Sequence, residues 1–214
     1  MAAPSSDFLK MYRAYGGIGR GSLFFCYRWL AFAHRLVSET IPPAGRIYDL
    51  GCGYGIFSNY LAMQRPERRL VAVDLSPVRI RSAERAARAL GLRNISFARE
   101  DIFRIGLESA QAVIITDFLH HLPSRESQTL LLERICAAIQ PGGKLIIVDV
   151  QNRPRWKYIL GWLVDHTIYL GDKINYLAIP ELIDFLAARG FQSRIVPIDA
   201  GRPYSNFLCV ATKR

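Results

Sequence analysis

The sequence predicts an α/β protein with a doubly wound, mostly parallel, seven-stranded sheet that ends in an antiparallel β-hairpin. Three observations predict this fold class. From residue 46 onward, short runs rich in Val and Ile alternate with helix-like stretches, which is the pattern of βαβ units in a parallel sheet. The last two strand-like runs are joined by six residues, AGRPYS, too few for a crossover helix. The chain of 214 residues is long enough to bury a sizeable core.

The expected strands are short enough to be buried on both faces of a sheet. They are Arg46–Leu50, Leu70–Asp74, Ile95–Arg99, Ala112–Thr116, Lys144–Val150, Gln192–Asp199 and Asn206–Thr212. The helices expected between them are Ile56–Gln64, Pro77–Leu90, Ser124–Ile139 and Pro180–Arg189. The second of these helices has ordinary start and stop signals, with Ser76 as the N-cap, Pro77 in the first turn and Gly91 after the last turn.

Residues 1–214 are expected to form a single domain with two additions to the alternating pattern. Residues 1–45 form an N-terminal amphipathic helical cap, in which Ser22–Thr40 reads as one helix with a narrow polar stripe and a wide apolar arc. Residues 151–179 form a substrate-side insertion. In an open α/β sheet, ligands bind outside the carboxyl ends of the strands, so both segments are candidates to cover that end.

Composition narrows the class of protein. The formal net charge of +10, from 28 basic and 18 acidic residues, favours anionic partners such as phospholipid, nucleic acid or acidic substrates. The four cysteines stand far apart, which predicts reduced thiols and neither a metal site nor a disulfide framework. The most apolar window, Leu23–Ala33, is too short to span a membrane. Together with the absence of a secretory signal pattern, this predicts a cytoplasmic protein.

A glycine-rich loop stands where the first strand ends and the first helix of the sheet begins. It reads Asp49-Leu50-Gly51-Cys52-Gly53-Tyr54-Gly55. Alternating glycines let the backbone turn sharply and approach a ligand closely, and the helix N-terminus beyond them presents N–H groups to an anion. A dinucleotide fingerprint, GxGxxG, would need glycine at the position of Ile56, so the spacing counts against NAD.

Two further acids follow the next strands. Asp74 closes the second strand, 23 residues after Gly51, where a carboxylate accepts hydrogen bonds from a ribose diol. Asp101 follows the third strand. Acids at three successive strand ends after a GxGxG turn predict a ligand pocket rather than solvated surface charges.

At this point the sequence resembles the class I S-adenosylmethionine (SAM)-dependent methyltransferases, which have a Rossmann-like fold. The resemblance covers residues 46–150 well and the terminal hairpin more loosely. The segment Leu119-His120-His121-Leu122-Pro123 after the fourth strand, and Pro141-Gly142-Gly143 before the fifth, are similar to the branch that acts on small molecules, including quinone and lipid methyltransferases.

The resemblance implies a set of contacts with SAM. Asp49 and the glycines of the loop hold the methionine part, Asp74 takes the ribose hydroxyls, and Asp101 meets the adenine amino group. Ile102 packs on the adenine ring. The cofactor-binding residues so implied are Asp49, Gly51, Gly53, Gly55, Asp74, Leu75, Asp101, Ile102 and Asp117.

Asp117 and His120 are the candidates for catalytic, substrate-side roles. Methyl transfer needs mainly a correct alignment of the two reactants, and a base helps when the acceptor is a phenol or an acidic carbon. Asp117 has three equally weighted roles: a polar contact with the substrate, a helix cap, or a partner of the sulfonium charge. Tyr12 and Tyr15 are candidates for a lid over SAM, with packing aromatics as the alternative.

The flanking segments predict an amphipathic acceptor such as a lipid, a quinone or a polyketide-like product. Both contain large apolar side chains, and basic residues stand beside them. A basic rim next to apolar groups suits the inner face of an anionic membrane, so peripheral contact with that surface is part of the expectation. The basic residues are Lys10, Arg13, Arg20, Arg153, Arg155 and Lys157.

Two other functions are weighed against this one. Arg81, Arg85 and Arg88 share one face of the helix from Pro77, which could follow the phosphates of RNA. A solvated helix face explains them better, because no aromatic residues are interleaved with the run, and RNA ranks second among the acceptors. The third hypothesis is a SAM-binding protein without catalytic activity.

Overall fold

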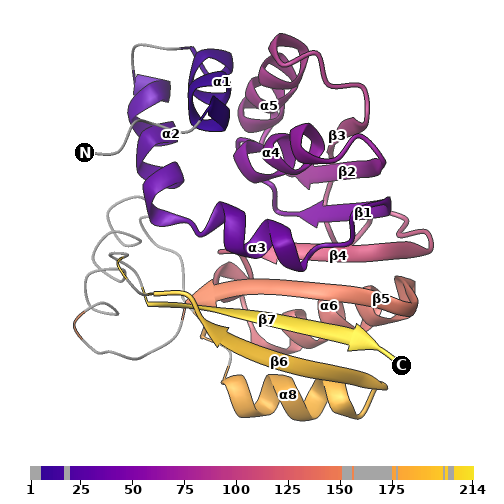
Figure 1. Ribbon diagram of the computed structural model, residues 1–214. Helices are drawn as coiled ribbons and strands as arrows, with labels where there is room; N and C mark the ends of the chain where they lie inside the picture. The colour runs from indigo at the N-terminus through magenta and orange to yellow at the C-terminus, as the bar shows by residue number, and fades with distance from the viewer. Residues whose placement is uncertain are drawn as a thin grey trace. The chain divides into compact units, whose positions relative to one another are not determined.

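The computed structural model describes residues 6–16, 20–150, 156, 175–176, 178–199, 201 and 205–214. The chain divides into two compact units, Met1–Ile105 and Gly106–Arg214. Figure 1 labels their helices and strands. Each unit contains strands with helices against them.

The first unit consists of three N-terminal helices followed by a βαβαβ segment. In chain order its elements are α1 (Ser6–Ala14), α2 (Arg20–Ala31), α3 (His34–Thr40), β1 (Gly45–Leu50), α4 (Ile56–Gln64), β2 (Arg68–Asp74), α5 (Pro77–Ala89) and β3 (Ile95–Arg99). Strand β2 lies between β1 and β3 and is parallel to both. Leu50 is opposite Val73, and Asp74 is opposite Arg99, so the three strands end at the same edge.

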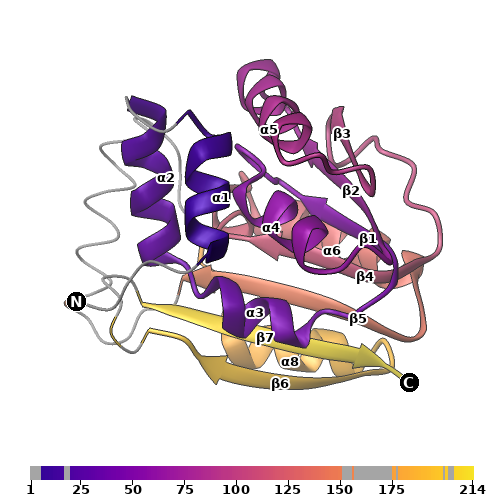
Figure 2. The same cartoon turned by 45° about the horizontal axis from the view of Figure 1, so that its top comes forward.

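The second unit begins with β4 and ends with the hairpin. Its elements are β4 (Ala110–Thr116), the 3-10 turn η1 (Leu119–His121), α6 (Arg125–Ala138), β5 (Ile139–Val150), α8 (Ile179–Ala187), β6 (Phe191–Pro197) and β7 (Asn206–Lys213). The strand order is β4-β5-β7-β6. Strands β4 and β5 are parallel, whereas β7 is antiparallel to both β5 and β6. Helix α8 lies against β6 (Figure 2).

These two strand sets confirm the predicted fold class. All seven expected strands form. The pairs β1–β2, β2–β3 and β4–β5 are parallel, and β6 and β7 make the antiparallel hairpin, with β7 also antiparallel to β5. Strand β5 starts at Ile139 rather than at Lys144. The added residues include a bulge in the β4–β5 register, and Gly142 within them has a φ of +75°. That backbone conformation favours glycine.

The prediction of one helix over Ser22–Thr40 is wrong, because the chain forms α2 and α3 with a break between them. Ala33 has φ −84° and ψ 54°, which is not helical. Because of this break, the rings of Phe32 and His34 join an aromatic cluster. The ring of Phe32 lies 4.9 Å from that of Phe57, and the ring of His34 stacks 4.5 Å from that of Trp29. Burial of these rings outweighs the continuation of the helix.

None of the helices in the described part of the chain combines the length and apolar character needed to cross a bilayer. The core of the first unit is built from β1, β2 and α4. Its fully buried side chains include Ile47, Leu50, Leu61 and Leu70.

Arg68 is a buried arginine at the start of β2, with 2% of its surface exposed. Its guanidinium donates to backbone carbonyls at the ends of α3 and α4 and in the loop after α3. The acceptors are the carbonyls of Pro42 at 2.9 Å, Leu61 at 3.2 Å, Ser38 at 3.2 Å and Ile41 at 3.2 Å. Burial lowers the pKa of this guanidinium to about 10. Arg68 therefore supplies hydrogen-bond donors to buried carbonyls at helix ends and in the loop after α3, although the carbonyl of Ser38 also accepts the N–H of Ile41.

Replacing Arg68 with Met should lower the free energy of unfolding by on the order of 3 kcal/mol, because several buried carbonyls lose their donor at once. The measurement is chemical denaturation followed by circular dichroism. Arg69→Met is the matched control, since Arg69 is exposed on the same strand. If the two variants unfold at the same denaturant concentration, Arg68 does not have this role.

Candidate functional site

The glycine loop after β1 is fixed by backbone hydrogen bonds to β2. The N–H groups of Gly51 and Cys52 both donate to the carbonyl of Val73, each at 2.9 Å. Gly53 and Gly55 have φ angles of +57° and +67°, a region that favours glycine. A Cβ on Gly55 would lie 2.6 Å from the Cβ of Ala83, whereas a Cβ on Gly53 would meet no atom within 4 Å. The loop is thus packed against the protein at Gly55 and open at Gly53.

Asp49, near the end of β1, is a buried carboxylate with one unsatisfied oxygen. Its Oδ2 accepts a hydrogen bond from the hydroxyl of Ser58, and its Oδ1 is buried without a partner among the described residues. Burial raises the pKa of Asp49 to about 6, the hydrogen bond from Ser58 opposes that rise, and the charge of Asp74 adds to it. A buried oxygen without a donor is costly, so Oδ1 suits a cationic group of a ligand.

Asp74, the last residue of β2, joins the glycine loop to the start of α5. Its Oδ2 accepts the N–H of Gly53 at 2.9 Å, and its Oδ1 accepts the N–H of Ser76 at 2.8 Å. The guanidinium of Arg79 lies 3.8 Å from Oδ2. A carboxylate has about four acceptor positions, so Asp74 can still accept hydrogen bonds from a diol.

The remaining predicted cofactor residues of the first unit follow β2 and β3. Asp101 accepts the N–H of Phe103 at 2.9 Å, and 42% of its side chain is exposed. Ile102 is buried, whereas Leu75 is 68% exposed. The strands place Asp49, Asp74 and Asp101 at one edge of the first unit, as the sequence predicts.

Cys52 lies inside the glycine loop and carries a thiol. Burial first, and then the nearby carboxylates of Asp49 and Asp74, raise the pKa of this thiol well above its usual value. The thiol therefore stays protonated at neutral pH, and it is a poor nucleophile.

Asp117 belongs to the second unit and directly follows β4. Among the described residues it is the only non-glycine residue with positive φ, at +48°. Its N–H donates to the carbonyl of Val148 at 2.8 Å, and its Oδ1 accepts from the side-chain amide of Asn206 at 2.9 Å. Such a backbone conformation costs free energy for a non-glycine residue, and it is frequent at functional sites.

His120, also in the second unit, is paired with a carboxylate. Its Nδ1 hydrogen-bonds to Oδ1 of Asp149 at the end of β5, and both side chains are almost fully buried. Oδ1 of Asp149 also accepts the N–H of Val150 at 2.7 Å, and the ring of Tyr176 stacks 6.1 Å from that of His120. Sequence reasoning missed Asp149. The available signal was an acid near the carboxyl end of the fifth strand, the same position that singled out Asp49 and Asp74.

The two tyrosines of the predicted lid differ in their contacts. The hydroxyl of Tyr15 donates to the carbonyl of Tyr54 in the glycine loop at 2.9 Å. Tyr12 packs against Phe8, with ring centroids 5.8 Å apart, and no contact of its hydroxyl with the loop is found in the described part of the chain. Most of the predicted substrate-side insertion, residues 151–179, lies outside the described residues.

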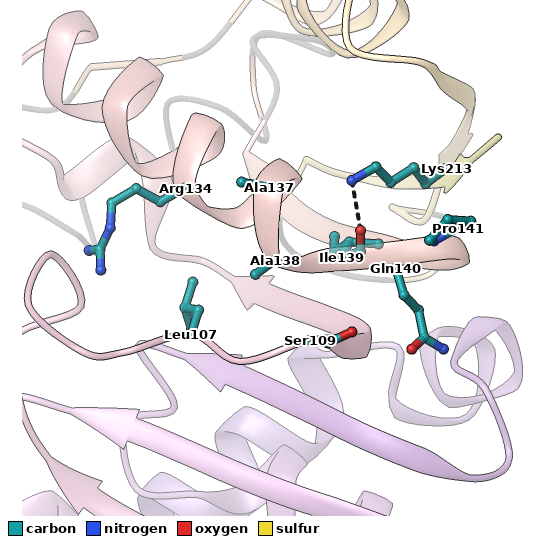
Figure 3. A pocket seen from close by; sticks show the side chains of 9 residues that line it. All are labelled: Leu107, Ser109, Arg134, Ala137, Ala138, Ile139, Gln140, Pro141 and Lys213. Carbon is teal, nitrogen blue, oxygen red and sulfur yellow. Dashed lines mark hydrogen bonds between the residues drawn. The ribbon is translucent and has the colours of Figure 1, made fainter.

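A pocket of about 580 Å³ lies elsewhere in the second unit (Figure 3). It is found where β5 begins, and its lining includes Ile139, Pro141 and Lys213. The ammonium of Lys213 donates to the carbonyl of Ile139 at 2.7 Å. Asp117 and His120 follow the opposite, carboxyl end of β4, so this pocket is not the predicted catalytic site. Within the described ranges there is no group of three His, Cys, Asp or Glu residues suited to a metal ion.

The predicted residues thus form two groups. The cofactor residues from Asp49 to Ile102 lie in the first unit, and Asp117 and His120 lie in the second. That SAM contacts these residues stays a prediction, as does the predicted single domain.

Comparison with known proteins agrees with this arrangement. Residues 47–143 match the family model of a methyltransferase domain. The carboxy-S-adenosyl-L-methionine synthase of Vibrio parahaemolyticus is 32% identical over 119 residues, which are 53% of this chain and 47% of that protein. The ubiquinone biosynthesis O-methyltransferase of Xanthomonas axonopodis pv. citri is 28% identical over 122 residues, 55% of this chain and 48% of that protein. The chain spans about half the length of these relatives.

Solved structures share the fold. The magnesium protoporphyrin IX methyltransferase from Synechocystis, determined with bound SAH, has a TM-score of 0.67 at 20% identity and covers 98% of this chain and 95% of its own. An O-methyltransferase family protein from Burkholderia thailandensis has a TM-score of 0.68 at 20% identity. The match covers 84% of this chain and 55% of the chain of that protein. The matched domain, the fold and the acids at the strand ends agree, and residues 47–143 of the chain are a methyltransferase domain of the class I SAM-dependent type.

Proposed function

We propose that this protein transfers the methyl group of SAM to a hydroxyl of an amphipathic small molecule, such as a lipid, a quinone or a polyketide-like product. The observation that carries the proposal is the unsatisfied Oδ1 of Asp49 beside the open glycine loop. It is a site for a cationic group that no described residue supplies.

The residues of the first unit fit SAM. Asp49 Oδ1 receives the ammonium group of the methionine part, and the open space at Gly53 lets that part approach the backbone. Asp74 would take the ribose hydroxyls, with Leu75 as its neighbour in the chain, and Asp101 with Ile102 would hold the adenine. When bound, SAM supplies a sulfonium methyl group that a nucleophile removes while the bonding electron pair returns to sulfur.

The surface of the N-terminal helices supports this class of acceptor. Leu30 in α2 is 75% exposed, and Leu36 in α3 is 41% exposed. The exposed basic residues Lys10 and Arg13 lie in α1. Exposed apolar side chains and exposed basic side chains on these helices suit an amphipathic acceptor at an anionic membrane surface. The ubiquinone O-methyltransferase among the relatives supports a quinone-like acceptor.

His120 is the proposed base. Because its Nδ1 faces the carboxylate of Asp149, Nδ1 carries the ring proton and Nε2 carries the lone pair. Nε2 takes the proton of the attacking hydroxyl, and the carboxylate of Asp149 balances the charge of the imidazolium. Water then removes the proton. Asp117 is the proposed polar contact at the end of β4, on the substrate or on the sulfonium.

The acceptor class can be tested with methyl-labelled SAM and an organic extract of lipids and quinones. Label is expected in the organic phase, and more of it when the extract is presented in anionic vesicles than in neutral ones, because the basic residues attract the anionic surface. Mass spectrometry identifies the labelled product. Label in RNA and none in the extract would replace this proposal with the RNA hypothesis.

The affinity for SAH, the demethylated product of SAM, should depend on the pKa of Asp49. With a pKa raised to about 6, the carboxylate is charged above that pH and neutral below it. The dissociation constant should therefore be constant between pH 7 and 8 and rise about tenfold per pH unit well below pH 6. Calorimetric titration at several pH values measures it.

The variant Asp49→Asn is the control for this pH dependence. It should bind SAH at least about tenfold more weakly at pH 8, because a charge-assisted hydrogen bond is lost, and its affinity should not change with pH. A melting curve checks that the variant is folded. If the dissociation constant of the parent protein for SAH does not change between pH 8 and pH 5, the proposed role of Asp49 is contradicted.

Replacing His120 with Gln should slow methyl transfer to a hydroxyl acceptor by roughly 10²- to 10⁴-fold and leave SAH affinity unchanged. Asp149→Asn should act in the same direction, because the wrong tautomer of His120 is then favoured. The loss should shrink as the pH approaches the pKa of the acceptor hydroxyl. His121→Gln is the matched control. Equal rates in the His120→Gln and His121→Gln variants would exclude His120 as the base.

A further inference from the structure

We infer that Tyr15 is a positioning residue of the glycine loop, through which the N-terminal helices set the affinity of the site for SAM. The inference rests on the SAM site proposed above and is independent of the acceptor. It concerns residues of the first unit only: Tyr15 after α1, Tyr54 in the glycine loop, and Asn59 in α4.

The hydroxyl of Tyr15 has both a donor and an acceptor around it. It accepts a hydrogen bond from the side-chain amide of Asn59 at 2.9 Å and donates to the carbonyl of Tyr54 at 2.9 Å. The same amide of Asn59 donates to the carbonyl of Ala83 in α5 at 3.1 Å. With the amide nitrogen of Asn59 as the donor, the hydroxyl of Tyr15 is left to donate its proton to the carbonyl of Tyr54.

This contact holds the peptide group between Tyr54 and Gly55 at both ends. The carbonyl of Tyr54 is bound by Tyr15, and the N–H of Gly55 donates to the carbonyl of Cys52 at 2.9 Å. Gly53, directly before Tyr54, donates its N–H to Asp74. A loop of three glycines loses much conformational entropy when it becomes ordered. A loop that is ordered before binding avoids this cost when the ligand arrives.

Tyr15 itself is held firmly. Its ring stacks on that of Phe25, with centroids 5.5 Å apart and planes at 18°, and Phe25 is completely buried. Helix α1 is also bonded to α4, since the side chain of Gln64 donates to Asp7 at 2.9 Å. Burial raises the pKa of Tyr15 well above its usual value, so the hydroxyl keeps its proton at neutral pH.

A packing role alone would predict a different outcome from a positioning role. Tyr12 provides the comparison, because it belongs to the same aromatic cluster, with its ring 6.2 Å from that of Phe25. Removing either hydroxyl leaves the ring in place. Of these two hydroxyls, that of Tyr15 bonds to the glycine loop, and for that of Tyr12 no bond to the loop is found among the described residues.

The test compares Tyr15→Phe with Tyr12→Phe. Calorimetric titration with SAH should show about fivefold to tenfold weaker binding for Y15F, the effect of about one hydrogen bond, and a change within about twofold for Y12F. Without ligand, hydrogen exchange of the amides in residues 53–55 should be faster in Y15F than in the parent, while exchange in β1 and β2 stays the same.

Parental SAH affinity in Y15F would overturn the inference, as would an equal loss in both variants, which indicates packing alone. If the parent protein binds no SAH, the proposed SAM site fails. In that case the exchange experiment still decides whether Tyr15 holds the loop, because it is done without ligand. Unchanged exchange at residues 53–55 would then overturn the inference.

Discussion

The rest of the site depends on the two hydrogen bonds that the carboxylate of Asp74 accepts. One of its oxygens binds the N–H of Gly53 and the other binds the N–H of Ser76, so a single side chain sets the loop after β1 and the turn after β2. Arg79 approaches the same carboxylate and also lies 5.9 Å above the ring of Tyr54. The negative charge of Asp74 also contributes to the raised pKa of Asp49. The shape of the loop and the charge balance of the site therefore have a common origin.

Sequence reasoning succeeded where structure is determined by neighbours along the chain. Helix α4 has the expected bounds, Ile56–Gln64, because glycine spacing and apolar periodicity define them locally. The break between α2 and α3 was missed, because the aromatic packing that causes it involves Phe57, far along the chain. The pairing of Asp149 with His120 was missed for the same reason, since the two residues are 29 positions apart, although the place of Asp149 near a strand end was a local signal. Patterns in the sequence identify elements and strand ends, but they do not identify the pairs that tertiary contacts create.

The basic excess of the chain has several separate causes. Arg68 is buried and binds carbonyls, and Arg79 lies beside Asp74. Arg81, Arg85 and Arg88 are exposed on α5, as a solvated helix face would be. The net charge is therefore a poor guide to the partner of this protein. The buried acids, which are fewer, carry more information about its ligand, because burial of a charge requires a compensating group.

Asn59 has one amide group that serves both the hydroxyl of Tyr15 and the carbonyl of Ala83, and its side chain is completely buried. This sharing limits how the sequence can drift. A lineage that replaced Tyr15 would leave one N–H of the Asn59 amide without an acceptor, in a side chain whose Oδ1 already has no partner among the described residues. A lineage that replaced Asn59 would free the tyrosine hydroxyl to rotate. Positions 15 and 59, which are 44 residues apart, should therefore covary among homologues as one inherited unit.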